Sequence, residues 1–154
     1  MEDLSFIPSG RGGKKALHKG FTYTKHRENS VGSVWHCVAR HSNCKGRLKI
    51  NSREDTAVLV KSHNHLPDFG QAKASKLVAA AKKRCLDEPN VLPSVVTRDT
   101  YANADLETLA ALPKEASVKQ ALRRLRREDL PRLPASLDEL ENIPAKYTTV
   151  DDER

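Results

Sequence analysis

The sequence predicts an α+β chain in which a small antiparallel sheet, stapled by metal, is followed by a helical extension. Residues 1–68 contain runs that alternate apolar and polar side chains with period two, which is typical of half-buried strands. Residues 69–129 change to stretches rich in Ala, Leu, Lys and Arg, which favour helices. Residues 130–154 combine prolines with acids and predict a flexible tail. We therefore expect three parts with these boundaries.

The first part shows the strand pattern repeatedly. Phe21–Lys25 alternates aromatic with hydroxyl or charged side chains, and Arg47–Asn51 alternates Leu48 and Ile50 with charge. Asn, Gly and Ser residues at 28–33 suit a turn. The expected strands lie around Phe6–Ile7, Lys15–Leu17, Phe21–Lys25, Val34–Val38, Arg47–Asn51 and Thr56–Lys61.

The second part predicts two long helices with shorter elements between them. One helix covers residues 71–85, with Leu77, Ala81 and Cys85 on one face at four-residue spacing. The other covers Lys114–Asp129, with an apolar stripe of Val118, Leu122 and Leu125. Between and after them we expect a short strand at Val95–Val96, helical residues at Asp105–Leu112 and one or two helical turns at Ser136–Glu141.

Two cysteines and two histidines form the most informative pattern in the chain. Cys37, Cys44, His63 and His65 have the spacing C-x6-C-x18-H-x-H. Thiolate sulfur and imidazole nitrogen are the ligands of a closed tetrahedral Zn²⁺ site. In an extended segment, residues two apart point to the same side, so the two imidazoles can meet one ion. We expect one structural zinc, because four protein ligands leave no position for a catalytic water.

Other interpretations of these residues stay open. The cysteines and histidines could be unrelated buried thiols and surface imidazoles, and His36 or His41 could replace one histidine of the pair. Val58 and Val60 are at even positions and His63 is at an odd one, so in an unbroken strand their side chains would point to opposite faces of the sheet. A bulge or a strand end must therefore come before the histidines. Cys85 is the remaining cysteine, and we expect it to be a thiol on a helix face.

Charge and composition restrict the partners. The formal net charge of the 154 residues is +7 and the pI is about 9.5, which favours polyanions and nucleic acid first. Up to Asp68 there are twelve basic and six acidic residues. No apolar run is long enough to span a bilayer, and the N-terminus lacks the features of a secretory signal. We therefore expect DNA as partner, no membrane, no small-molecule substrate and a nuclear location.

With these residues in view, the first 68 positions resemble the FLYWCH-type zinc finger, a WRKY–GCM-like zinc cluster. The series that names the family can be read as Phe6, Leu17, Tyr23, Trp35, Cys37 with Cys44, and His63 with His65. The Trp-x-Cys at 35–37 and the ending His63-Asn-His-Leu-Pro-Asp carry the resemblance best. The resemblance implies a small zinc-clamped antiparallel sheet that binds DNA or protein.

The remainder resembles, less specifically, the segment that precedes the catalytic domain in Mutator-like transposases. That catalytic domain is RNase H-like and needs three separated acids. Residues 69–154 are too short to hold such a domain. We therefore expect no enzymatic activity, and a chain that is a domesticated or truncated transposon product.

Nucleic-acid contacts are expected from the basic residues of the finger. The segment Gly10–Lys15 is notable because its glycines permit close approach to a groove. By resemblance to the WRKY–GCM group, this segment is the expected reading element. The candidates are Arg11, Lys14, Lys15, Lys25, Arg27, Arg40, Lys45, Arg47 and Lys49.

The helix at Lys114–Arg127 has two interpretations, with six basic residues and one acid. It could contact phosphates, or it could dock onto a partner through its apolar stripe. For the chain as a whole, the leading hypothesis is a zinc-dependent DNA-binding protein. The alternatives are a protein-interaction adaptor and the non-catalytic N-terminal fragment of a transposase, and RNA binding stays open.

Overall fold

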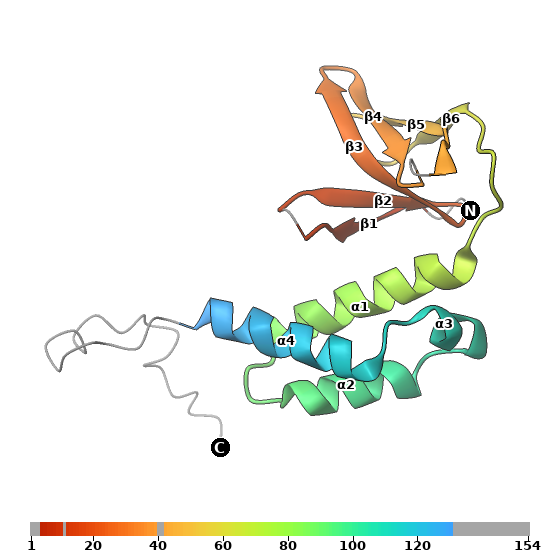
Figure 1. Cartoon of the computed structure of the whole chain (residues 1–154). Helices are drawn as coiled ribbons and strands as arrows, with labels where there is room; N and C mark the ends of the chain where they lie inside the picture. Colours follow the sequence, from red (N-terminus) through yellow and green to blue (C-terminus); the bar gives the residue numbers. More distant parts are fainter. Residues whose placement is uncertain (1–3, 11, 40–41, 131–154) are drawn as a thin grey trace, which may run out of the picture.

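The computed structural model describes residues 4–10, 12–39 and 42–130, and these form an antiparallel sheet followed by helices (Figure 1). The α+β prediction is confirmed. The sheet has six strands: β1 (Ser5–Pro8), β2 (Lys14–His18), β3 (Phe21–Asn29), β4 (Gly32–Cys37), β5 (Arg47–Asn51) and β6 (Ala57–Lys61).

The strands form a simple meander, with each strand paired to the next in the order β1-β2-β3-β4-β5-β6. All six predicted strands are present, and Arg47–Asn51 has the predicted bounds. Strand β3 runs to Asn29, beyond the predicted Lys25, because it pairs along its length with β4. A register shift between Lys25 and Arg27 marks an irregularity in this pair, and such bulges increase local twist.

Alternation divides the sheet into an inner and an outer face. The inner face carries the hydrophobic core, in which Tyr23, Trp35, Leu48 and Ile50 are completely buried. The indole nitrogen of Trp35 donates a hydrogen bond to Ser33 Oγ at 2.7 Å, so this buried donor is satisfied. The outer face carries the residues of opposite parity in β3, β4 and β5.

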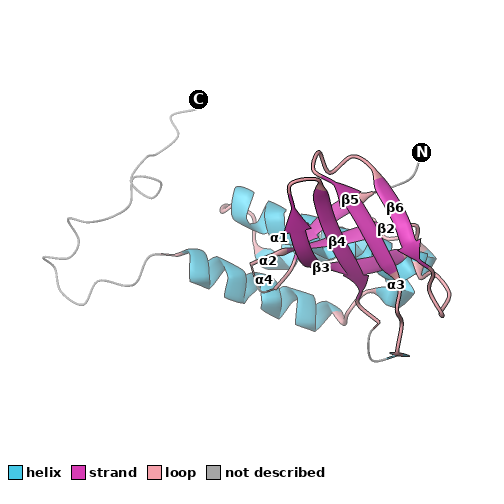
Figure 2. Cartoon of the chain, turned by 90° about the horizontal axis from the view of Figure 1, so that it is seen from above, coloured by secondary structure: helices cyan, strands magenta, loops and turns pink. Residues whose placement is uncertain are grey.

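Four helices follow the sheet. They are α1 (Phe69–Asp87), α2 (Pro93–Ala102), α3 (Leu106–Ala111) and α4 (Glu115–Asp129). Helix α1 contacts the other three helices and also β1 and β3. Figure 1 shows the helices below the sheet with α1 nearest to it, and Figure 2, the view from above, shows β3 to β6 in front of the helices.

The joint between sheet and helices is tight. The backbone N–H of Asp68 donates to Gly20 O at 2.9 Å, and the Asp68 side chain accepts from Gln71 N at 2.7 Å as the N-cap of α1. Gly20 has φ +77°, and a Cβ there would lie 2.8 Å from Pro67 Cβ. Only glycine fits this position, which holds the start of α1 against the β2–β3 turn.

The helices have a hydrophobic core of their own. It consists of Ala81, Cys85, Val96, Val118 and Leu122. The predicted buried face of α1 is therefore confirmed at Ala81 and Cys85, and that of α4 at Val118 and Leu122. Leu77 and Leu125 are half-buried, and the partly buried side chains that pack against this core are Val78, Val91 and Tyr101.

The prediction of a short strand at Val95–Val96 is wrong, because these residues lie in α2. Pro93 occupies the first turn of the helix, where its fixed φ suits the helix and its missing N–H has no cost. Val96 is buried in the helical core, and Thr97 and Thr100 donate to Pro93 O and Val96 O. Tertiary packing thus overrides the weak helix propensity of β-branched residues. The helical turns predicted at Ser136–Glu141, and the tail beyond Leu130, lie outside the described residues.

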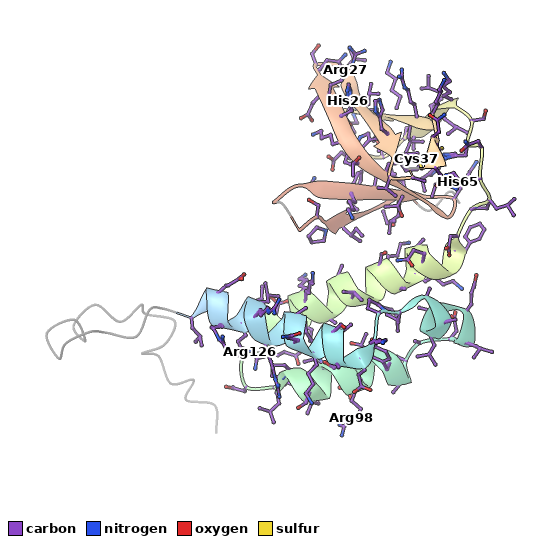
Figure 3. All side chains as sticks on the ribbon, in the orientation of Figure 1. His26, Arg27, Cys37, His65, Arg98 and Arg126 are labelled. Carbon is purple, nitrogen blue, oxygen red and sulfur yellow. The ribbon has the colours of Figure 1, made fainter. Side chains whose placement is uncertain are left out.

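Arg126 binds the C-terminal end of α1 from its position on α4 (Figure 3). Its Nη2 donates to Cys85 O at 2.8 Å, to Glu88 O at 3.1 Å and to Val91 O at 2.8 Å. These carbonyls lie at the end of α1 and in the connection to α2, where a helix leaves acceptors without intrahelical partners. One guanidinium therefore joins three segments of the helical part.

We expect Arg126→Ala to lower the free energy of unfolding of the helical part by on the order of 2 kcal/mol, since hydrogen bonds from a charged donor are lost. Chemical denaturation followed by circular dichroism measures the change. The matched control is Arg127→Ala, whose exposed side chain should change stability by no more than about 0.5 kcal/mol. Equal effects of the two substitutions would contradict the capping role of Arg126.

Candidate metal centre and basic face

The fold brings the four predicted ligands together at one end of the sheet. Cys37 is the last residue of β4, Cys44 lies in the loop between β4 and β5, and His63 and His65 follow the end of β6. Their ligand atoms all lie within 4.8 Å of one another. Figure 3 shows Cys37 and His65 side by side at this end. Strand β6 ends at Lys61, which supplies the strand end that the parity of His63 requires.

Two sulfur–nitrogen distances in the cluster are close to those around a tetrahedral ion. Cys37 Sγ lies 3.3 Å from His65 Nε2, and Cys44 Sγ lies 3.4 Å from His63 Nδ1. With Zn–S and Zn–N bonds of usual length, a tetrahedron places sulfur about 3.5 Å from nitrogen. The four side chains are buried or half-buried, so little would have to move to enclose the ion.

Hydrogen bonds select which nitrogen of each imidazole faces the ion. His65 Nδ1 lies 3.0 Å from Leu66 O, so this nitrogen carries the proton and leaves Nε2 for the metal. His63 turns Nδ1 toward Cys44 Sγ, and its Nε2 lies 2.8 Å from Tyr23 Oη. With a metal on Nδ1, Nε2 would carry the proton and donate to Tyr23 Oη. Outer partners of this kind fix the orientation of metal-binding histidines.

Aromatic packing holds His63 in place. The ring of Phe21 stacks on it with centroids 3.7 Å apart and an interplanar angle of 7°, and Tyr23 meets it edge-on at 5.4 Å. Burial, followed by the neighbouring His65, lowers the pKa of His63 and favours the neutral imidazole that a metal requires.

Backbone groups face both sulfurs. Ala39 N donates to Cys37 Sγ at 3.5 Å, and Gly46 N donates to Cys44 Sγ at 3.3 Å. Burial raises the pKa of the Cys37 thiol, and Cys44 beside it adds to the shift. A divalent cation would reverse this balance, because a coordinated thiol is deprotonated. The donor set therefore suits a cation that neutralises two thiolates.

Two other histidines, His36 and His41, are alternative ligands by their position in the sequence. His36 lies on the outer face, where its ring stacks on His26 with centroids 4.1 Å apart, so it does not join the cluster. His41 lies outside the described residues.

One comparison with known families bears directly on this geometry. Residues 6–65 match the FLYWCH zinc finger domain. The match covers under half of the chain, so it identifies the finger and not residues 69–154. No curated protein matches the chain significantly. The resemblance of the helical part to transposases therefore stays a prediction.

The FLYWCH finger binds one structural zinc ion, with Cys37, Cys44, His63 and His65 as ligands. The site is closed by four protein ligands, so the ion would supply folding free energy and no reaction centre.

None of the helices within the described part of the chain has both the length and the apolar character of a membrane span.

The basic residues of the finger divide between its two faces. Lys14 and Lys25 are on the inner side, where Lys14 pairs with Glu54 at 2.9 Å and Lys25 with Glu28 at 2.6 Å. Their ammonium groups also lie over the rings of Phe6 and Trp35. Lys45 is exposed in the loop after Cys44. Arg11 and Arg40 lie outside the described residues.

The outer face of the FLYWCH finger carries cations in rows that cross the strands. One row follows the pairing of β2 to β6: Lys15, Thr24, His36, Arg47 and Lys61. A second row is Arg27, Val34, Lys49 and Val58. No acidic residue occupies either row.

Sequence reasoning missed several members of this site. Phe21 and Gly46 of the metal centre, and His26 and Lys61 of the outer face, were not recognised. Alternation within one strand is enough to place Lys49 and Arg47 on the same face of the sheet. The positions of Lys61 and His26 on that face follow from the pairing register of the strands, which the sequence does not specify.

Gly46 is the position at which the smallest change should disturb the metal. A Cβ there would lie 2.4 Å from His63 Cε1 and 2.5 Å from His63 Nδ1. We expect Gly46→Ala to push the imidazole from its ligating position and to weaken zinc binding at least tenfold, since lost positioning of a ligand commonly costs 10- to 100-fold. Competition with a chromogenic chelator measures the affinity.

Gly10→Ala is the matched control, because a Cβ at Gly10 meets no atom within 4 Å. This variant should bind zinc as the unmodified chain does. Unchanged zinc affinity in Gly46→Ala would show that His63 Nδ1 is not a ligand.

Proposed function

We propose that this chain is a zinc-dependent DNA-binding protein and that the outer face of its FLYWCH finger contacts the phosphate backbone. The observation that carries this proposal is the register of the sheet, which aligns Lys15, Arg47 and Lys61 in one row and Arg27 with Lys49 in the next. Arg27, Arg47, Lys49 and Lys61 are exposed.

The distribution of charge supports a polyanion as the partner. Acidic residues pair with the cations on the inner side, as Glu54 does with Lys14 and Glu28 with Lys25. The outer rows thus keep their positive charge for an external partner. Each phosphate that such a side chain neutralises releases condensed counterions, which is the main source of affinity for nucleic acid.

The dimensions of the row suit a duplex. Neighbouring strands lie about 4.8 Å apart, so the row from Lys15 to Lys61 spans about 19 Å across four strand spacings. That length corresponds to five or six base pairs at about 3.4 Å each. The stacked pair of His26 and His36 lies within this surface and adds two hydrogen-bonding rings.

The zinc ion acts in this proposal through the fold. Cys37 ends β4, which carries His36, and Cys44 precedes β5, which carries Arg47. By holding these strand ends together, the ion fixes the spacing of the outer rows. Because the recognised part of the chain is a zinc-binding finger, we further propose that the protein has no enzymatic activity. DNA as its partner leads us to propose action in the nucleus. The resemblance of the helical part to Mutator-like transposases leads us to propose an origin from a transposon.

A second candidate function is an adaptor that binds protein, and the edge strand β6 favours it. Val58, Leu59 and Val60 are exposed there by 58%, 49% and 61% of their surface. Exposed apolar edges of this kind can pair with a further strand. The apolar stripe of α4 does not support an adaptor, because Val118 and Leu122 are buried within the helical core.

We expect Arg27→Gln with Arg47→Gln to weaken binding of the zinc-loaded chain to duplex DNA roughly tenfold or more, which corresponds to about 1.4 kcal/mol. The slope of log K against log salt should also fall by about 0.9 for each lost phosphate contact. Fluorescence anisotropy with a labelled duplex at several salt concentrations measures both quantities.

The matched control is Lys14→Gln with Lys25→Gln, which removes the same charge from the inner side of the same sheet. It should leave affinity within about twofold of the unmodified chain. If both double variants weaken binding equally, the outer face is not the contact surface. If chelation of zinc leaves binding unchanged, the proposed zinc dependence is wrong.

A further inference from the structure

Helix α4 presents three arginines that the fold itself does not use. Val118 and Leu122 turn one side of the helix into the helical core, where Cys85 Sγ lies 3.8 Å from Leu122 O. Arg123, Arg124 and Arg127 are exposed on the remaining surface. Arg126, the fourth arginine of this segment, is half-buried and caps α1, so it belongs to the fold.

Two other cations of the helical part, Lys73 and Arg84, are neutralised within the chain. Lys73 pairs with Asp105 at 3.1 Å and with Glu107 at 3.0 Å. Arg84 pairs with Glu88 at 2.9 Å and with Asp99 at 3.0 Å. Within the part of the chain that the structure describes, no carboxylate pairs with Arg123, Arg124 or Arg127.

The three arginines as a group do not stabilise helix α4. Arg123 and Arg127 are like charges four residues apart, a spacing that opposes helix formation. Arg127 lies in the last turn, where a cation stabilises the helix dipole, but Arg123 and Arg124 precede that turn. Neither packing nor the dipole explains the whole group.

We propose that Arg123, Arg124 and Arg127 form a second surface for nucleic-acid phosphates, separate from the FLYWCH finger. In a helix Arg123 and Arg127 are about 6 Å apart along the axis, close to the rise of two nucleotides. Arginine suits this use because its planar guanidinium binds phosphate oxygens through two parallel hydrogen bonds.

This assignment selects between the two interpretations of the helix at Lys114–Arg127. Docking through the apolar stripe is excluded by the burial of Val118 and Leu122. What α4 offers to a partner is its cationic side. Nucleic acid is the favoured polyanion because the finger of the same chain carries a second cationic face, so the choice of partner rests on the proposed function. The surface on α4 is a different one from the proposed finger contact, and variants can test the two separately.

The test compares three variants of the full zinc-loaded chain on one labelled duplex of about 25 base pairs. The first is Arg123→Gln with Arg124→Gln and Arg127→Gln. Glutamine has a helix propensity similar to that of arginine, so the helix should persist, and circular dichroism checks this. We expect the salt slope to fall by about 2 to 3 and the affinity at low salt to fall at least tenfold.

The charge-matched control is Lys82→Gln with Lys83→Gln and Arg98→Gln, which removes three exposed cations from α1 and α2, of which Arg98 lies 3.7 Å from Asp99. It should keep a slope close to that of the unmodified chain. An equal fall in both triple variants would show that net charge alone governs binding and would overturn the proposal, as would an unchanged slope in the α4 variant.

The third variant, Arg27→Gln with Arg47→Gln, separates the two surfaces. If only the α4 variant weakens binding, the proposed finger contact is wrong and the α4 surface stands. If only the variant of Arg27 and Arg47 weakens binding, the α4 surface is wrong and the finger contact stands. Vesicles with about 30% phosphatidylserine test the other polyanion. Loss of vesicle binding without loss of DNA binding in the α4 variant would assign the surface to anionic lipid and overturn the proposal.

Discussion

The coordination of one zinc ion by Cys37, Cys44, His63 and His65 is the constraint on which the finger depends. The ligands come from the end of β4, the loop before β5 and the segment after β6, so the ion joins three parts of the chain. The hydrophobic core of the sheet includes only two of these ligands, Cys37 and Cys44. The core of the sheet contains few large side chains, chiefly Tyr23, Trp35, Leu48 and Ile50. A domain of this size is marginal without a metal or a disulfide, and a structural zinc contributes about 10–16 kcal/mol of binding free energy.

The same ion connects the sheet to the rest of the chain. His65 is followed within four residues by the start of α1, and Pro67 and Asp68 contact the turn at Gly20. Phe21, next to that turn, stacks on His63. Metal site, β2–β3 turn and helix start are therefore one packed unit. Through it, the zinc orients the cationic outer face of the sheet relative to the helical part and its arginine surface on α4.

Much of this arrangement could be predicted from the sequence, because the signals are local. Period-two alternation located the strands, and the order and spacing of Cys and His identified the ligands before any geometry was known. The helix at Pro93–Ala102 was missed because β-branched Val95 and Val96 favour strands locally, whereas burial of Val96 among Cys85, Val118 and Leu122 is a long-range effect. The grouping of Lys15, Arg47 and Lys61 depends on strand register, and the role of Arg126 depends on the packing of α4 against α1. Neither can be predicted from neighbouring residues.

The zinc content of the purified full chain tests the central claim most directly. Native mass spectrometry, with elemental analysis of the same sample, gives the number and identity of bound ions. The coordination described above predicts one zinc per chain, and prolonged chelation should remove it together with the ordered tertiary signals of the sheet core around Trp35. A chain that contains no zinc when purified without chelators, fails to take up added zinc and still keeps its folded sheet would contradict the account.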